Sequence, residues 1–254
     1  MVPLSAVLIT QDEARHLPEA LESVRFCDEI VVVDCGSRDG SRALAEAAGA
    51  RVIVHEPWPG FVAQRKFAAE AARHDWVLAV DADERVSPPL RAEIEAHRSV
   101  GFDHDGYRIP RVARYLGRWI RGTDWYPDPQ LRLWDRRKGR WEGALVHESV
   151  KVRGRVGRLR NDLLHLTYDD ISDHLRTIDN YTSLWARQAY AEGRRTGPLE
   201  AVAACGWAFF RNYAIRRGVL LGAAGITVST LNAYYTYVKL AKLLELQQGA
   251  LPPP

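Results

Sequence analysis

Short apolar runs alternate with amphipathic stretches along the first hundred residues. The runs are rich in β-branched residues and predict strands at residues 4–10, 29–34, 50–55 and 75–81. Between them, polar and apolar positions follow a helical period at residues 13–24, 41–48 and 60–74. Continuous apolar strands separated by helices are typical of a parallel sheet covered on both faces. The short connections favour right-handed βαβ units, so this part of the chain is predicted to be α/β.

The pattern changes after residue 100. Strands of an antiparallel or mixed region are predicted at residues 106–115, 129–135 and 144–152, with an aromatic-rich loop at 116–128. From Asp169 to about Gln248 the sequence pattern predicts helices. We therefore predict an α/β domain over residues 1–168 and a helical region over residues 169–254.

Polar side chains gather where the predicted parallel strands end. They are Thr10 and Glu13 after the first strand, Asp34 after the second, and Asp81 and Asp83 after the fourth. Ligands of open α/β sheets bind outside the carboxyl ends of the strands, so these residues are expected to line one crevice.

Three carboxylates, Asp81, Asp83 and Glu84, crowd the end of the fourth strand in "DWVLAVDADERV". Their mutual repulsion predicts that a positive group lies among them. Asp81 and Asp83 are two residues apart and so lie on one side of an extended segment. Hard oxygen ligands at this spacing suit Mg²⁺ or Mn²⁺, and Mg²⁺ held by one or two carboxylates usually bridges to phosphates. The alternative is a solvated turn whose acids cap the helix that begins at "SPPL".

Other phosphate-binding motifs are absent from the sequence. There is no G-x-x-x-x-G-K-[ST] loop, which excludes a P-loop nucleotide hydrolase, and no G-x-G-x-x-G after the first strand, which argues against a dinucleotide site.

Charge and cysteine content narrow the partners and the compartment. The net charge of +3 is too small to indicate a nucleic-acid partner, although it is compatible with phosphorylated or anionic-lipid partners. The three cysteines show neither a disulfide framework nor metal-ligand spacing. With no signal-peptide pattern in the sequence, we expect a cytoplasmic location.

Three ordered motifs, "VLITQDEARHLPEALESV", "EIVVVDCGSRDGS" and "WVLAVDADE", resemble the family 2 glycosyltransferases that use nucleotide-diphospho-sugars. "PQLRLWDRRKGRWEGALVHESV" and "LLHLTYDDISDHLRTIDNYTSLWA" extend the resemblance toward the branch that contains lipopolysaccharide-core β-1,4-glucosyltransferases. The resemblance implies a GT-A fold: a mixed sheet flanked by helices, with a C-terminal helical extension. It also implies inverting transfer of a sugar from UDP or another nucleotide to a hydroxyl of a glycan or lipid-linked acceptor of the cell envelope.

The resemblance assigns roles to the strand-end residues. Thr10 and Glu13 are expected to meet the nucleoside, and Asp34 the base, for which uracil is favoured. Asp81 is expected near the ribose and the metal, and Asp83 is expected to ligate the metal, Mn²⁺ or Mg²⁺. The chain departs from the family at Asp12, where an asparagine is usual.

A metal stabilises the departing diphosphate as a Lewis acid, and basic residues could assist it. Arg65 and Lys66, in the helix before the fourth strand, are candidates; the alternative is a solvated helix face. His165, in "LLHLTY", is a candidate for metal or diphosphate contact and His147 a weaker one, although a histidine on an apolar segment is more often structural. Imidazole would favour Mn²⁺.

Inverting transfer needs a general base that takes the acceptor proton. The candidates are Glu148, Asp128, Glu142 and Asp124; we favour Glu148, with Asp128 next. The alternative for Glu148 is a surface ion pair with an arginine such as Arg132.

Two residues are assigned to the acceptor side. Trp125 is expected to be exposed and to stack on a sugar, and Arg132 is assigned to the acceptor as well. The alternative for the tryptophans of this region is that they fill the core beneath the loop.

The C-terminal region raises the question of a membrane. Residues 218–238 carry no charge and residues 207–218 are basic and aromatic, as in a helix at a lipid headgroup boundary. We expect a peripheral enzyme on the inner face of the cytoplasmic membrane. Packing within a soluble domain or a homo-oligomer is the alternative, and a spanning helix is less favoured because Thr, Ser, Asn and Tyr interrupt the segment.

Other functions fit the motifs less well. A phosphohydrolase with a D-x-D motif normally carries it near the start of the chain. A nucleotidyltransferase would need a Gly-rich basic loop after the first strand. A non-catalytic sugar- or lipid-binding module would not need the intact set of acids. The donor sugar and the acceptor are left open.

Overall fold

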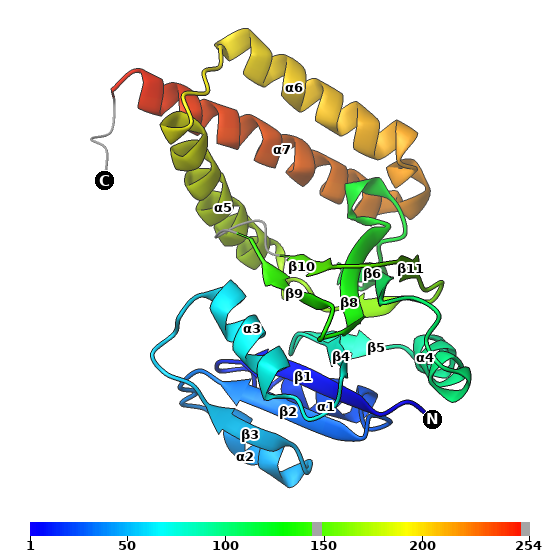
Figure 1. The fold of residues 1–254 in the computed structure, drawn as a ribbon. Helices are drawn as coiled ribbons and strands as arrows, with labels where there is room; N and C mark the ends of the chain where they lie inside the picture. Colours follow the sequence, from blue (N-terminus) through cyan, green and yellow to red (C-terminus); the bar gives the residue numbers. More distant parts are fainter. Residues whose placement is uncertain (144–148, 250–254) are drawn as a thin grey trace. The chain divides into compact units, whose positions relative to one another are not determined.

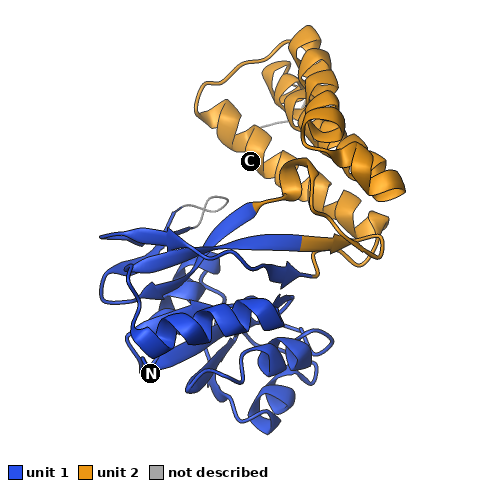
Figure 2. Cartoon of the chain, turned by 90° about the vertical axis from the view of Figure 1, so that its right-hand side faces the viewer, with its two compact units in different colours: residues 1–112, 128–165 blue, residues 113–127, 166–254 orange. Residues whose placement is uncertain are grey.

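The computed structural model describes residues 1–143 and 149–249 (Figure 1). The chain forms two compact units (Figure 2): unit 1 comprises Met1–Val112 and Asp128–His165, and unit 2 comprises Ala113–Pro127 and Leu166–Pro254. Compactness does not test whether either part folds alone, so the predicted domains at residues 1–168 and 169–254 stay a prediction.

Unit 1 is built on a mixed sheet. Four strands, β1 (Leu4–Thr10), β2 (Glu29–Asp34), β3 (Arg51–Val54) and β4 (Trp76–Ala79), are parallel. The sheet continues in the order β3-β2-β1-β4-β8-β6-β12-β5, and β11 also pairs with β6. The added strands are β5 (Glu84–Val86), β6 (Gly106–Tyr115), β8 (Asp128–Asp135), β11 (Val156–Arg158) and β12 (Leu163–His165). The predicted α/β class and the mixed sheet are confirmed.

Helices cover both faces of this sheet, because alternate strand residues point to opposite sides. On one face, Leu4, Ala6 and Leu8 of β1 pack in a core with α1 (Leu17–Ser23), α2 (Ser41–Ala47) and α4 (Pro88–Val100). On the other face, Val7 of β1 packs with residues of α3 (Phe61–Ala71).

A two-stranded ribbon completes the second face. It consists of β9 (Gly139–Glu142) and β10 (Ser149–Val152), which pair antiparallel. Trp141 and Val150 lie opposite each other across the ribbon and join the core formed with α3. The predicted strand at 144–152 is described only from residue 149.

The capping of α4 shows how the chain leaves the acidic stretch. Ser87 accepts a hydrogen bond from the backbone nitrogen of Leu90 at 3.3 Å, and Pro88 and Pro89 occupy the first helical turn. The acids before "SPPL" therefore do not serve as the helix cap.

Unit 2 is mainly helical, as predicted for the C-terminal region. Its elements are β7 (Arg118–Trp119), which pairs with the end of β6, the 3₁₀ turns Thr123–Trp125 and Gly218–Leu221, α5 (Ile171–Ala191), α6 (Pro198–Phe210), the π-helical turn Arg211–Ile215 and α7 (Gly222–Gln247). One small core contains Tyr115, Ile120, Ala224 and Val228.

No single helix within residues 1–143 and 149–249 has the length and apolar character to cross a bilayer. Two consecutive helical segments, Pro198–Ile215 and Gly218–Gln247, together have the length and composition of a membrane span, but they are bent by 66° relative to each other.

Candidate active site

A pocket of about 420 Å³ opens where β1 and β4 end, and all of its walls belong to unit 1. We call it the strand-end pocket. It is lined by Ile9, Thr10, Gln11, Glu13, Trp58, Phe61, Arg65, Asp81, Ala82, Asp83 and His165. Six of the residues predicted for the site, Thr10, Glu13, Arg65, Asp81, Asp83 and His165, are therefore brought together, from segments up to 155 positions apart in the chain.

The structure identifies the positive groups that offset the acids. Asp81 accepts two hydrogen bonds from Arg65, at 2.9 and 3.0 Å, and also pairs with the buried guanidinium of Arg132. Burial by itself would raise the pKa of Asp81, but the charges of Arg132 and Arg65 outweigh burial and hold this pKa well below its usual range. Asp81 is therefore ionised and tied to two arginines.

Glu84 has no exposed surface and is held in the same network. Its Oε1 accepts from Arg132 at 2.8 Å and from Arg111 at 3.1 Å, while its Oε2 accepts from the backbone nitrogen of Asp81 at 3.0 Å. Arginine side chains thus neutralise two of the three crowded carboxylates, and Arg65, one of the two basic residues that the sequence suggested beside a metal, is among them.

Asp83 differs from Asp81, which also lines the strand-end pocket, and from the buried Glu84 because it lies beside a histidine. Its Oδ2 lies 3.0 Å from Nε2 of His165, and the two residues reach each other because β12 pairs with β5. Adjacent ligands of an octahedral ion with bonds of about 2.1 Å stand about 3 Å apart, so this pair fits two ligand positions of Mg²⁺ or Mn²⁺. Within the described residues, no group of three His, Cys, Asp or Glu side chains is arranged to hold a metal.

Thr10 and Asp34 lie side by side at the ends of β1 and β2, as partners in the parallel ladder. Asp34 Oδ1 accepts hydrogen bonds from the backbone of Gly36 and Ser37 and from Arg42. Burial opposes ionisation, yet the bonds from Ser37 and Arg42 leave the pKa of Asp34 lowered. Its Oδ2 and the Thr10 hydroxyl are buried without a hydrogen-bond partner in the part of the chain that the structure describes. Buried polar atoms without partners are rare and mark this corner as a place for a polar ligand. Asp34 itself is fully buried and is not in the pocket wall.

The departure at Asp12 has a local explanation. Asp12 adopts a positive φ of 54°, which asparagine and aspartate tolerate better than most residues. Its Oδ1 accepts from the backbone nitrogen of Arg38 at 2.7 Å. This contact needs an acceptor, so a carboxylate serves there as well as an amide oxygen.

The family model described as Glycosyl transferase family 2 matches residues 5–149, more than half of the chain. The chain belongs to glycosyl transferase family 2. The chain is therefore a glycosyltransferase, and its mixed sheet flanked by helices is the GT-A fold that the resemblance implies.

Two relatives extend the match over nearly the whole chain. The lipopolysaccharide core biosynthesis glycosyltransferase LpsC of Rhizobium meliloti is 31% identical over 96% of this chain and 93% of its own. An uncharacterized glycosyltransferase of Rickettsia felis is 28% identical over 96% of this chain and 90% of its own.

Among solved structures, a complex of glucosyl-3-phosphoglycerate synthase from Mycobacterium tuberculosis with Mn²⁺, uridine diphosphate and glucosyl-3-phosphoglycerate is 24% identical. The match covers 46% of this chain and 45% of that chain, with a TM-score of 0.36. This similarity is too low to assign a ligand or a site residue.

The candidate bases of this family 2 glycosyltransferase lie in different places. Glu148 and His147 fall outside the described residues. Asp128 accepts from Arg111 at 2.6 and 2.9 Å and from Gln130 at 2.6 Å. Glu142 accepts from Arg140 at 2.7 Å. Asp124, in unit 2, pairs with Arg211 and accepts from Asn212.

The two acceptor-side residues are not placed as expected. Arg132 is buried and tied to Asp81 and Glu84, so its guanidinium supports the acids and is not presented to a ligand. Trp125 is half-buried in unit 2, where it packs beside Tyr115 and donates from Nε1 to Asn232 at 3.1 Å. The expectation that Trp125 is exposed is therefore wrong, and the alternative, that it fills the core beneath the loop, describes it better.

Sequence reasoning missed several members of the site. Trp58 and Phe61 line the pocket, and Arg111 neutralises Glu84. Arg132 was named, but for the acceptor and not for its pairing with the acids. The one available signal was Glu84 itself, because an acid in a buried strand needs a nearby cation.

Proposed function

We propose that this glycosyltransferase transfers a hexose, with inversion and metal dependence, from a uridine-diphospho-sugar to a hydroxyl of a lipid-linked acceptor. The observation that carries the proposal is the pair of Asp83 and His165, 3.0 Å apart at a pocket of about 420 Å³. The similarity to LpsC supports an acceptor of the lipopolysaccharide-core type.

The nucleoside end of the donor is assigned to the corner beside β1 and β2. An ionised carboxylate only accepts hydrogen bonds, and the imide N–H of uracil is a donor. The lowered pKa of Asp34 and its unpartnered Oδ2 favour a contact with that N–H. Because Asp34 is fully buried and outside the pocket wall, this contact requires the corner to open when the donor binds. Thr10 and Glu13, in the pocket wall, are assigned to the nucleoside as well.

The diphosphate end is assigned to Asp83, His165 and Arg65. A divalent cation held by Asp83 and His165 would supply Lewis-acid stabilisation of the charge on the leaving diphosphate. Arg65 lines the same pocket, and its Nη2 donates to both carboxylate oxygens of Asp81, which holds the guanidinium in place. A guanidinium that is positioned in advance stabilises developing negative charge without reorganisation.

For the general base we retain Glu148. Each of the three described alternatives, Asp128, Glu142 and Asp124, is already engaged with an arginine. A base must be able to approach the acceptor hydroxyl within hydrogen-bond reach.

The test of this function is metal-dependent turnover of UDP-glucose by two single variants. Asp83→Asn and His165→Gln each remove one proposed ligand and should reduce Mn²⁺-dependent hydrolysis and transfer by about a hundredfold or more, since the ion supplies several kcal/mol of transition-state stabilisation. His97→Gln replaces a half-buried histidine away from the pocket and should be unaffected. Full activity of Asp83→Asn in the presence of a chelator would remove the metal from the proposal.

We also propose a peripheral location on the inner face of the cytoplasmic membrane. Unit 2 exposes large apolar side chains on α6 and the turns that follow it; they are Leu199, Val202, Trp207, Phe210, Ile215, Val219 and Leu220. Leu220 is 72% exposed and Trp207 56%. Residues 201–244 contain no Asp or Glu, while Arg211, Arg216 and Arg217 lie among the apolar residues. Asp124 pairs with Arg211 and Arg216, so one acid offsets part of this positive charge. Exposed aromatic and apolar side chains with an excess of cations fit an anionic bilayer surface.

A further inference from the structure

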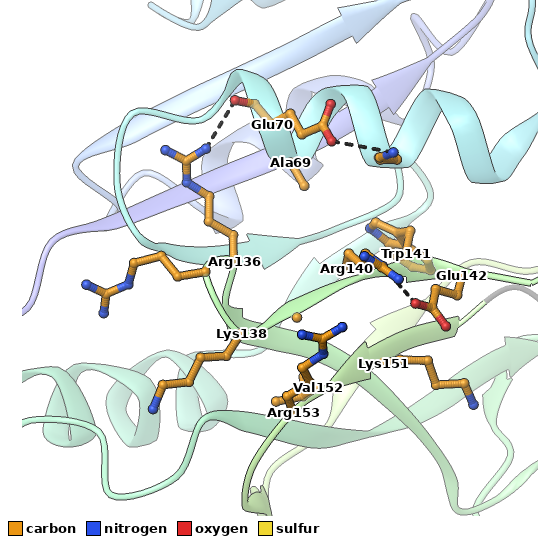
Figure 3. A pocket seen from close by; sticks show the side chains of 13 residues that line it. Ala69, Glu70, Arg136, Lys138, Arg140, Trp141, Glu142, Lys151, Val152 and Arg153 are labelled. Carbon is orange, nitrogen blue, oxygen red and sulfur yellow. Dashed lines mark hydrogen bonds and ion pairs between the residues drawn. The ribbon is translucent and has the colours of Figure 1, made fainter.

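A second pocket, of about 480 Å³, lies in unit 1 between α3 and the β9–β10 ribbon. We call it the basic pocket. Seven of its thirteen lining residues are Lys or Arg and two are Glu; the cations are Lys66, Arg136, Arg137, Lys138, Arg140, Lys151 and Arg153. Figure 3 shows most of these side chains around the opening, with Trp141 between α3 and the ribbon. The local excess of five positive charges exceeds the net charge of +3 of the whole chain.

Some of these cations are compensated. Arg140 pairs with Glu142 at 2.7 Å, Lys138 with Asp105 at 2.5 Å, and Arg137 with Asp75 at 3.0 Å. Arg137 also pairs with the buried carboxylate of Asp135 at 2.6 Å. Asp75, Asp105 and Asp135 lie outside the pocket lining, and their three charges reduce the excess of five positive charges to two. The pocket and its immediate surroundings therefore remain positive.

Three cations have no carboxylate partner among the residues that the structure describes. Arg136 donates to the carbonyl oxygens of His74 and Glu70, at 2.9 and 3.1 Å, which fixes its guanidinium without cancelling its charge. Lys151 and Arg153 are exposed, and no hydrogen bond or ion pair holds either side chain within the described ranges. The pocket therefore offers one guanidinium that is fixed by backbone carbonyls and two exposed cationic side chains that could bind a ligand.

The register of the ribbon places like charges against each other. Lys151 lies directly opposite Arg140, and the backbone nitrogen of Arg153 bonds to the carbonyl of Lys138 at 2.8 Å. Like charges directly opposite in an antiparallel pair are destabilising. An anion bound between the cationic side chains of the two strands would relieve this repulsion.

The basic pocket adjoins the proposed donor machinery. Lys66 lines the basic pocket, and Arg65, the next residue toward the N-terminus of α3, lines the strand-end pocket. Trp141 lines the basic pocket and lies under the guanidinium of Arg65, 5.0 Å from its ring centroid. A ligand in the basic pocket would therefore lie one side chain away from the proposed diphosphate site.

We propose that the basic pocket binds phosphate groups belonging to the acceptor side of the reaction, separately from the donor diphosphate. The assignment of the phosphate to the acceptor rests on the proposed function, whereas the binding of phosphate itself does not. Several guanidinium and ammonium groups around one pocket suit a multivalent phosphate better than a single carboxylate. The phosphate could be carried by the acceptor glycan or by a lipid headgroup, because both offer the same chemistry.

The first test measures binding of inorganic tripolyphosphate by calorimetry with UDP at saturating concentration, which occupies the strand-end pocket, and without a divalent cation, because tripolyphosphate chelates Mn²⁺. Wild-type protein should bind. The double variant Lys151→Gln/Arg153→Gln should bind about tenfold more weakly or worse, since it removes two charged donors. The double variant Arg25→Gln/Arg91→Gln removes the same charge from exposed positions elsewhere in unit 1 and should bind like the wild type. No binding, or equal binding by both double variants, would overturn the proposal.

The second test separates the two sources of phosphate. If the acceptor carries it, the Lys151→Gln/Arg153→Gln variant should show a raised KM for a phosphorylated acceptor and an unchanged KM for the same acceptor after phosphatase treatment. If a headgroup carries it, the same variant should lose binding to phosphatidylglycerol vesicles. If neither changes, the pocket is only a charged surface and the proposal fails. Hydrolysis of UDP-glucose should be normal in both variants; its absence in the wild type would contradict the proposed function and not the phosphate site.

Discussion

Three neighbouring carboxylates at the end of β4 have three different environments. Asp81 is held by Arg65 and Arg132, Glu84 by Arg132 and Arg111, and Asp83 faces a pocket beside His165. The difference arises because neighbouring strands bring different side chains to each carboxylate. Asp81 and Glu84 are held in a structural network of arginines, whereas Asp83 is available to a ligand.

The structural network gives a pH-dependent prediction. Because the folded-state pKa of Asp81 is depressed below its unfolded value of about 3.9, its contribution to stability is present above that pH and is lost as pH falls through the folded pKa. Asp81→Asn removes a carboxylate that pairs with both Arg65 and Arg132, and it leaves Arg132 with Glu84. We expect it to lower the free energy of unfolding at pH 7 by about 3 kcal/mol or more.

Urea denaturation between pH 7 and pH 3 measures this effect. The difference between wild type and Asp81→Asn should shrink below about pH 4, where the wild-type carboxylate begins to lose its advantage. Glu22→Gln breaks an exposed pair and should change stability little at any pH. A difference that stays constant with pH would show that the charge of Asp81 is not what stabilises the fold.

The choice of base gives a second prediction at the scale of residues. Glu148→Gln should leave the affinity for UDP unchanged while transfer to the acceptor falls by about 10²–10⁴-fold, because only proton removal is lost. Asp128→Asn is the comparison, since it disturbs a carboxylate committed to Arg111. Rapid transfer by Glu148→Gln together with slow transfer by Asp128→Asn would assign the base to Asp128.

At the scale of elements, helix packing in unit 2 depends on a glycine. A Cβ at Gly225 of α7 would lie 1.8 Å from the carbonyl oxygen of Gly218, so the two segments meet backbone to backbone. Gly206, in the exposed face of α6, has open space around the same position.

Alanine at these two positions should have opposite effects. Gly225→Ala should destabilise the protein by about 2–3 kcal/mol, because the added methyl forces the segments apart. Gly206→Ala should stabilise it by about 0.5–1 kcal/mol through helix propensity. Thermal unfolding of both variants checks this, and a destabilised Gly206→Ala would mean that α6 packs against something more than unit 2 of one chain.

The elements also show where sequence reasoning works. Strands at 4–10 and 29–34 match the structure, because continuous apolar runs have one favourable arrangement in a two-sided sheet. The predicted strand at 106–115 also matches, although three arginines interrupt its apolar positions. The three-residue strands β5, β11 and β12 were not predicted, since three residues carry no usable period. The location of the site was predicted from strand ends, but Arg111 and Arg132 reach the acids only through the pairing of β6 with β8, which no local pattern reveals.

At the scale of the whole molecule, charge and apolar surface are unevenly distributed. The basic pocket belongs to unit 1, and the apolar surface of α6 and its following turns belongs to unit 2. The net charge of +3 conceals both features, because acids elsewhere in the chain offset the cations.

The proposed membrane surface predicts vesicle binding. Protein should co-sediment with vesicles that contain phosphatidylglycerol, less so as salt is raised. Trp207→Ala/Phe210→Ala should weaken binding about tenfold or more, since each aromatic ring buries a large apolar area.

The matched control is Leu44→Ala/Val54→Ala, which truncates two exposed apolar side chains of unit 1 and should bind vesicles normally. Equal binding by both pairs would rule out the α6 surface as the lipid contact. Sedimentation equilibrium without vesicles tests a third possibility, that the surface binds a second copy of the chain. In that case the wild type should be a dimer, and the Trp207→Ala/Phe210→Ala variant should be a monomer.

The arginines around Asp81 and Glu84 affect how folding of the site depends on the proposed divalent cation. Since the chain carries its own counter-charges for these acids, assembly of the site does not have to await a cation. If sugar transfer needs the proposed cation, a cell short of manganese or magnesium would keep folded but inactive protein, and transfer could resume when the ion returns.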